Sequence, residues 1–192
     1  MNRVILAALL STAFALAACN NNGAANNDLA VNTLTVDNAD LGNTADMNAA
    51  APAGTVDAAF VTDGIKGDTA EVAIGQLAAQ KGSTQAVKDF GNMLVTDHGG
   101  HKQKLIDLAG SAGITVPTEP AEAGHATLLK LQGLSGPAFD KAFASSLVDS
   151  HHKGIAKNEA QAKSGDPQTA AIAQQTLPVL KKHLEMAEKL AQ

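Results

Sequence analysis

Apolar residues recur every three or four positions through most of the chain after residue 56, which is the spacing of one face of an α-helix. Gly, Ser and Pro positions divide this region into segments. The sequence predicts four long helices, over about 56–81, 84–110, 136–164 and 167–192. It also predicts a shorter helical piece over about 121–132, inside an extended connection that contains proline.

The lengths of the connections predict how these helices pair. Two short turns, near 82–83 and 165–166, and one long connection are typical of an antiparallel four-helix bundle. The first helix is then expected to pair with the second and the third with the fourth, with both short turns at the same end. The chain has five Phe and no Trp or Tyr, and no alternating strand pattern, which favours an all-α fold over a sheet core.

Polar residues occupy inward positions in these apolar stripes. In the second predicted helix His98 and His101 fall where the pattern expects apolar residues, and in the third His151 does so. Glu71 takes an inward or edge position on the first helix. On the fourth helix His183 continues the stripe formed by Ile172, Thr176, Val179, Met186 and Leu190.

The depth of these polar residues follows from a rise of about 1.5 Å per residue. Counted from the turn near 82–83, His98 lies about 23 Å along its helix and Glu71 about 17 Å along the first helix. Counted from the turn near 165–166, His151 lies about 22 Å and His183 about 26 Å along their helices. If both turns share one end, the three histidines form one layer, with Glu71 somewhat above it and His101 below it.

A layer of buried imidazoles must be hydrogen-bonded or bound to a metal, because an unsatisfied buried polar group costs about 1–3 kcal/mol. Three imidazoles from separate helices could share one divalent ion, with Asp97 and Asp149 as acceptors or ligands beside them. Such ligands suit Fe, Zn, Cu, Ni or Mn, and the sequence does not choose among these metals. The alternative is a structural bundle whose histidines only form core hydrogen bonds. We expect His125 and His152 at the surface.

The sequence offers little support for an enzyme. The stretches "DHGGH" and "DSHH" place an Asp close before a His, an arrangement that can orient a general base. No nucleophile elbow, phosphate-binding loop or dinucleotide fingerprint accompanies them. We therefore expect a binding or structural protein.

The N-terminus has the pattern of an export signal over residues 1–18. Arg3 precedes an apolar run of about 13 residues, which is too short for a permanent membrane span of about 20. The run ends in "LAAC", which resembles the lipobox at which a bacterial lipoprotein is cleaved and lipidated on its cysteine, here Cys19. Asn20 in the next position is similar to signals for the outer membrane. We expect a periplasmic protein with a lipid anchor in a membrane.

Residues 19–55 are rich in Asn, Ala, Asp, Gly and Thr and contain no Lys or Arg, which predicts a disordered tether. Cys19 is the only cysteine, so a thiolate metal site and an internal disulfide are excluded. Removing Arg3 and the four tether acids from the 14 basic and 19 acidic residues leaves 13 and 15 in residues 56–192. This near balance gives no indication of nucleic-acid binding by the helical domain.

Four marks of the helical domain also form a recognisable combination: Glu71, "MLVTDH" at 93–98, "VDSH" at 148–151 and "TLPVLKKHL" at 176–184. Over about residues 58–191 the chain resembles the family called domain of unknown function 4142. The resemblance implies an exported bacterial protein with a ferritin-like four-helix bundle, and it points to His98, His151 and His183. "HHKGIAKNEAQA" is locally similar to domain of unknown function 305. None of the four long helices carries the Glu-x-x-His pair of di-iron ferritins, so ferroxidase activity is not expected.

Overall fold

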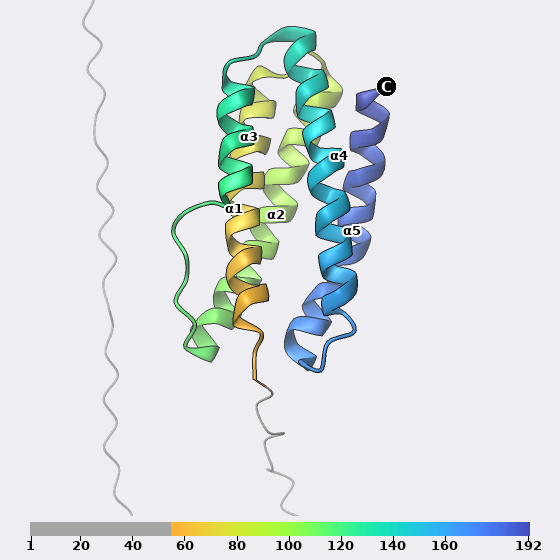
Figure 1. Ribbon diagram of the computed structural model, residues 1–192. Coiled ribbons are helices and arrows are strands. Elements are labelled where there is room, and N and C mark those ends of the chain that lie inside the picture. Colours follow the sequence, from red (N-terminus) through yellow and green to blue (C-terminus); the bar gives the residue numbers. More distant parts are fainter. Residues whose placement is uncertain (1–54) are drawn as a thin grey trace, which may run out of the picture. The chain divides into compact units, whose positions relative to one another are not determined.

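The computed structural model describes residues 55–192, which form five α-helices and contain no strand. The predicted all-α fold, with four long helices and a short one between the second and third, is confirmed. The predicted signal peptide, Cys19 and nearly all of the predicted tether lie outside the described residues. The helices are α1 (Ala58–Lys81), α2 (Gln85–Ala112), α3 (Glu122–Gln132), α4 (Gly136–Gln161) and α5 (Pro167–Ala191) (Figure 1).

The helix ends carry the residues that local physics favours there. The Thr84 side chain accepts a hydrogen bond from the Val87 N–H at the start of α2. Asp166 caps α5 in the same way and is followed by a proline in the first turn, as the sequence predicts. Helix α2 is capped at its C-terminus by Gly113, whose φ of 68° lies in the left-handed region that glycine adopts at little cost.

The long helices pair as predicted, α1 with α2 and α4 with α5, but the two short turns lie at opposite ends of the bundle. Ser83, in the first turn, donates its N–H and its hydroxyl to the carboxylate of Asp140 near the start of α4. The N–H of Asp57, before α1, donates to Asp166 in the second turn at 2.8 Å. The expectation of a shared end was wrong, because the long connection and α3 lead the chain back along the bundle before α4 begins (Figure 1).

Two hydrophobic clusters fill the bundle, one toward each end. Both are built from residues of α1, α2 and α5, and α3 and α4 contribute only to the larger cluster. On α2, Leu94 belongs to one cluster and Leu105 to the other, with His98 and His101 between them. The histidines therefore lie in a polar layer that separates two apolar cores. Among the described residues, no helix is both long and apolar enough to span a membrane.

The inward face of α5 differs by one position from the predicted stripe. Val179 is 36% exposed, whereas Leu180 is 6% exposed and His183 is fully buried. Ala173 and Ala187 are also fully buried, seven residues on either side of Leu180. The sequence argument gave larger apolar residues more weight, but the small alanines are the residues that face the other helices.

Candidate metal centre

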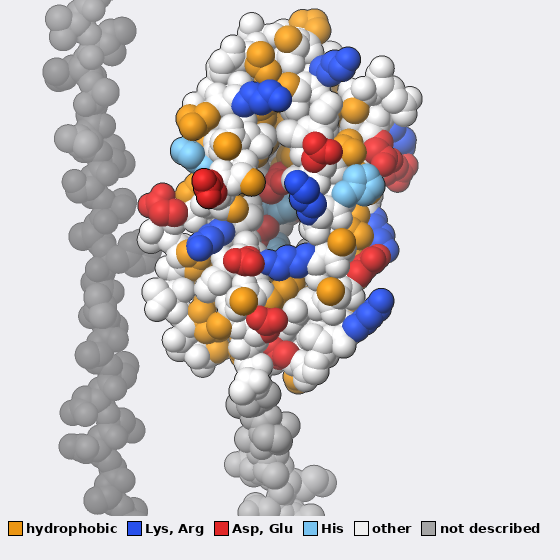
Figure 2. Space-filling view, in the orientation of Figure 1, with side chains coloured by type: hydrophobic (Ala, Val, Ile, Leu, Met, Phe, Trp, Pro, Cys, Tyr) orange, Lys and Arg blue, Asp and Glu red, His pale blue; other side chains and the backbone are white. Residues whose placement is uncertain are grey.

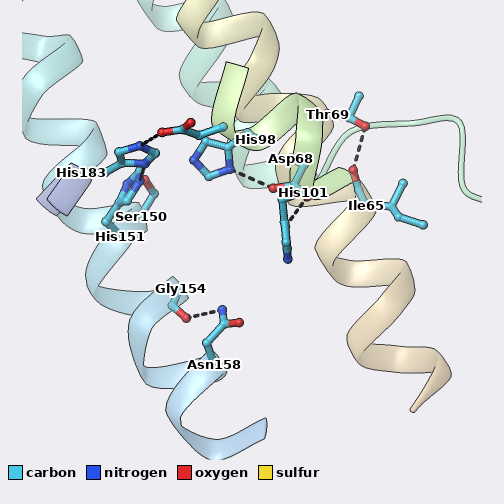
Figure 3. A network of polar contacts seen from close by, with 11 residues as sticks. Ile65, Asp68, Thr69, His98, His101, Ser150, His151, Gly154, Asn158 and His183 are labelled. Atoms are coloured by element: carbon cyan, nitrogen blue, oxygen red, sulfur yellow. Dashed lines mark hydrogen bonds and ion pairs between the residues drawn. The ribbon is translucent and has the colours of Figure 1, made fainter. Parts of the chain in front are cut away.

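Three histidines from three helices converge in the polar layer: His98 from α2, His151 from α4 and His183 from α5 (Figure 3). Each offers one ring nitrogen, and these three atoms all lie within 4.8 Å of one another. The ring centroids are 5.3–5.6 Å apart, and all three residues are buried. The predicted layer is present in the fold.

The layer forms although the two turns lie at opposite ends of the bundle. The three histidines lie nearer the middle of their helices than the ends, with at least eight residues beyond them on either side. A residue near the middle of a helix has a similar depth from either end. The sequence estimate was therefore insensitive to its wrong assumption about the turns.

Carboxylates hold the outer nitrogens of two of the imidazoles. Nδ1 of His98 lies 2.8 Å from Oδ1 of Asp68, and Nε2 of His183 lies 2.9 Å from Oδ2 of Asp97. An ionised carboxylate only accepts hydrogen bonds, so each of these nitrogens carries the proton and donates. Metal-binding histidines commonly have this second contact, because it fixes the ring orientation and leaves the other nitrogen free to bind.

The third imidazole is held by the backbone. Nδ1 of His151 lies 3.0 Å from the carbonyl oxygen of Leu147, so this nitrogen also donates. The inner nitrogens of His151 and His183 are then 3.2 Å apart, and in neutral rings both present lone pairs. A cation between them removes this repulsion.

The spacing of the inner nitrogens also fits a metal. Two nitrogens that bind one tetrahedral ion at about 2.0–2.1 Å lie about 3.3 Å apart, close to the 3.2 Å between His151 and His183. Nε2 of His98 is buried and has no hydrogen-bond partner. Its ring must approach the other two by no more than about 1.5 Å to complete a three-nitrogen site. Such a site leaves the fourth position of a tetrahedral ion open.

The ionisation of the layer reflects burial and neighbouring charge. Burial, together with the charges of the other two histidines, lowers the pKa of His151 to about 3. Burial also lowers the pKa of His183, although Asp97 acts in the opposite direction. Burial opposes the charged form of His98, but its hydrogen bond to Asp68 and the nearby acids outweigh this effect and raise its pKa. His151 is thus held neutral, the form that binds a metal.

The three predicted carboxylates have different positions. Asp97 binds His183, as described above. The Oε2 atom of Glu71 is buried without a partner, and burial raises the pKa of this carboxyl group, but Glu71 is not among the groups that converge within 4.8 Å. Asp149 is exposed on α4 and has no hydrogen bond to a histidine among the described residues, so the structure gives it no role in the layer.

The sequence argument missed Asp68, which is 5% exposed. One carboxylate oxygen of Asp68 contacts His98, and the other contacts Nδ1 of His101 at 2.7 Å. These two hydrogen bonds lower the pKa of Asp68 although burial opposes its ionised form. The signal was present in the sequence, because Asp68 lies three residues after Ile65 and seven after Val61, on the buried stripe of α1.

A cavity of about 520 Å³ adjoins the histidine layer. Its buried lining includes all three histidines and Asp68, while its exposed lining includes Lys104 and Lys157. Figure 2 shows a hollow in this face of the molecule, with acidic and histidine side chains at its floor and lysines around it. The predicted surface residues His125 and His152 are exposed and are not part of this lining.

Comparison with known proteins gives a family and a fold. The family model of domain of unknown function 4142 matches residues 42–190. A solved structure, a DUF305 fragment from Deinococcus radiodurans, is similar with a TM-score of 0.65 and 14% sequence identity, over 73% of this chain and 98% of that chain. At this identity the likeness supports the fold alone. The search of curated proteins found no match.

Proposed function

The chain belongs to the domain of unknown function 4142 family, and from this premise we propose that it binds one transition-metal ion in its histidine layer. One observation carries the proposal: three buried imidazoles direct their inner nitrogens to one point, while protein acceptors hold all three outer nitrogens. The donor set suits Fe, Zn, Cu, Ni or Mn. Glu71 is the nearby carboxylate that could approach the open position of the ion.

We further propose that the protein works at a membrane surface in the periplasm. The support is the "LAAC" sequence before residue 20, which fits lipidation of Cys19, with an outer-membrane location favoured by Asn20. A lipid-anchored bundle with one bound metal ion would serve metal handling or the response to envelope stress. No hydrolytic or redox reaction is part of this proposal.

Metal analysis of the purified chain, made without a histidine tag, tests the metal site. After reconstitution we expect one ion in the histidine layer, and the variant that combines His98→Ala, His151→Ala and His183→Ala should lack this ion. The matched control combines His125→Ala and His152→Ala, which removes two exposed histidines, and it should keep the ion. Circular dichroism establishes that each variant is still helical.

The second candidate function is a structural or partner-binding bundle without a metal. It is favoured by the hydrogen bonds of the outer nitrogens, because in each imidazole one of the two ring nitrogens already has a protein partner. In this case reconstitution with Fe, Zn, Cu and Mn leaves the chain free of metal, and single His→Ala changes in the layer only lower its stability. That combination of results would exclude the metal proposal.

A further inference from the structure

The cavity beside the histidine layer has a part that the proposed metal site does not use. Its lining continues past the three histidines along α1 and α5, where it includes the apolar side chains of Phe60, Ile172 and Leu180. Its volume of about 520 Å³ falls within the roughly 300–1,000 Å³ of typical small-molecule pockets. An apolar wall of this size suits the body of an organic molecule, because binding removes apolar surface from water.

Two glycines inside helices keep this part of the cavity open, although packing does not require them. Apart from its own helix, a Cβ atom on Gly67 of α1 would meet no atom within 4 Å. One on Gly154 of α4 would meet only Leu180 Cδ1 at 3.6 Å, which is an ordinary contact. Both glycines line the cavity. Glycine inside a helix is less stable than alanine, so both positions give up helix stability where a side chain has room, which favours a ligand in that space.

A buried acceptor in this part of the cavity has no partner. Asn158 on α4 is 8% exposed, and its amide nitrogen donates to the carbonyl of Gly154 at 2.9 Å. The amide oxygen, Oδ1, is buried and has no hydrogen bond among the described residues. Figure 3 shows this amide extending from α4 toward the side where α1 lies. An amide oxygen only accepts hydrogen bonds, so the group that satisfies it must be a donor, such as a hydroxyl.

The charges that remain unpaired in the lining are positive. Three of its four acids already have a partner: Asp63 has Lys157, Asp68 has His98 and His101, and Asp97 has His183. Burial raises the pKa of the fourth, Glu71, and so opposes its charged form. Lys104 on α2 and Lys153 on α4 are exposed and form no ion pair within residues 55–192. Because lysines surround the hollow in Figure 2, an acidic group on the ligand is favoured at the opening.

We propose that this cavity binds a small organic acid with an apolar body and a hydroxyl group. The hydroxyl donates to Asn158 Oδ1, the body lies against the apolar wall, and the carboxylate faces Lys104 and Lys153 at the opening. Lys153 and Asn158 are five residues apart on α4, which separates them by about 7.5 Å along the helix axis. A molecule of two fused rings with these groups at opposite ends matches that span. This binding requires no metal ion, so it goes beyond the proposed function.

Fluorescence titration of the purified, metal-free chain with a hydroxynaphthoate tests the site. This probe carries its hydroxyl and its carboxylate at opposite ends of two fused rings, and the chain has no Trp or Tyr that would obscure its emission. We expect one probe molecule per chain. Naphthoate, which lacks the hydroxyl, should bind about tenfold more weakly, and naphthol, which lacks the carboxylate, about threefold more weakly.

Variants of the lining assign each contact. Asn158→Leu removes the acceptor, so this variant should bind hydroxynaphthoate no better than naphthoate, while it keeps the preference for hydroxynaphthoate over naphthol. Lys104→Met combined with Lys153→Met should have the opposite effect on the two preferences. Lys102→Met combined with Lys163→Met, which changes two lysines outside the lining, is the matched control and should bind as the wild type does.

Gly67→Leu fills the space directly. Leucine is a better helix former than glycine, and the position has room for the Cβ atom, so the variant should unfold at the same or a higher temperature. It should no longer bind the probe, because the added side chain occupies the cavity. Circular dichroism measures the unfolding temperature, and the same fluorescence titration measures the binding.

The possible results separate this proposal from the metal proposal. A wild-type chain without saturable probe binding overturns the organic-acid site and means that the cavity holds only water. Binding that survives in Gly67→Leu, or a hydroxyl preference that survives in Asn158→Leu, also overturns it, because the probe then lies elsewhere. Since the probe is titrated into the metal-free chain and the histidine layer is tested by metal analysis, either proposal can fail without the other.

Discussion

Asp68 orients two histidine rings of the polar layer, since its two carboxylate oxygens accept hydrogen bonds from Nδ1 atoms on two successive turns of α2. The spacing of His98 and His101, three residues apart on one helix, places both rings on the same side for this contact. The carboxylate thereby selects the tautomer of both rings. In its neutral form each imidazole then has an unprotonated Nε2 for a ligand.

Replacing this carboxylate should weaken metal binding without removing a direct ligand. In Asp68→Asn the amide nitrogen donates, so it cannot accept a hydrogen bond from the second ring, and one histidine must change tautomer or rotate. We expect zinc affinity to fall by about 10–100-fold, as is typical when such supporting contacts are removed. Competition titration with a chelator measures the change. Asp149→Asn, at an exposed position of α4, should leave the affinity unchanged, and an equal loss in both variants would contradict the assignment.

The metal-free protein should become less stable as the pH falls below neutral. His151 has a pKa of about 3 in the folded chain against 6.5 for an ordinary histidine, so only the unfolded chain takes up this proton between those values. The stabilisation that comes from keeping this ring neutral is therefore fully present above pH 6.5. As the pH falls from 6.5 toward about 3, the free energy of unfolding decreases by about 1.4 kcal/mol per pH unit. Urea unfolding of the metal-free chain between pH 7 and pH 5 measures the slope. His151→Gln should have a clearly shallower slope, and an unchanged slope would show that other groups cause it.

Among single residues, the sequence predicted the histidines that interrupt an apolar stripe. It did not predict the buried polar residues near them, Asp68 and Asn158. His98, His151 and His183 replace apolar residues on recognisable stripes, so their convergence could be anticipated. Asp68 lay on a stripe interrupted by Gly64 and Gly67, which made the inward face of α1 ambiguous. Asn158 lies seven residues after His151 on the buried side of α4, but an isolated amide carries no chemical signature.

At the scale of elements, a close crossing of two glycines controls how α1 packs on α2. A Cβ atom on Gly91 would lie 2.6 Å from the carbonyl oxygen of Gly75, and one on Gly75 would lie 2.7 Å from that of Gly91. Neither backbone can move aside while the helices stay packed. The absence of side chains here lets the two helices approach closely.

Two glycine substitutions in the same helix should therefore have opposite effects. Gly91→Ala should lower the free energy of unfolding by about 1–3 kcal/mol, because the added methyl group forces α1 and α2 apart. Gly99→Ala should raise it by up to about 1 kcal/mol, since a Cβ atom there meets nothing within 4 Å and alanine favours the helix. Thermal or urea unfolding measures both changes. A stabilised Gly91→Ala variant would mean that the helices do not cross as closely as described.

The existence, order and pairing of the helices were predictable from the sequence. Which end of the bundle each short turn occupies was not. Caps such as Thr84 and Asp166 are local signals that the sequence displays directly. The direction of α4 depends on whether the connection over 113–135 crosses one end of the bundle or runs along its length. That choice depends on tertiary contacts, such as the hydrogen bond from Lys81 Nζ to the carbonyl of Gln132, which no local pattern reveals.

At the scale of the whole molecule, the proposed membrane anchor can be tested independently of the metal. Cys19→Ser removes the thiol that would carry the lipid, so we expect the variant to move from the membrane fraction to the soluble periplasmic fraction. A single acyl chain gives only marginal membrane binding, and stable anchoring requires more than one. Fractionation of cells that express either form, with detection by immunoblotting, measures the change. Equal membrane association of both forms would count against lipidation.

The proposed function requires a metal ion between the three buried imidazoles. Anomalous X-ray diffraction from crystals of the zinc-loaded chain, recorded at the zinc edge, locates the ion directly. We predict a peak about 2.0–2.1 Å from Nε2 of His98, Nε2 of His151 and Nδ1 of His183. A zinc-loaded crystal whose anomalous peaks lie only at surface residues, with the three imidazoles in contact only with protein, would contradict the account.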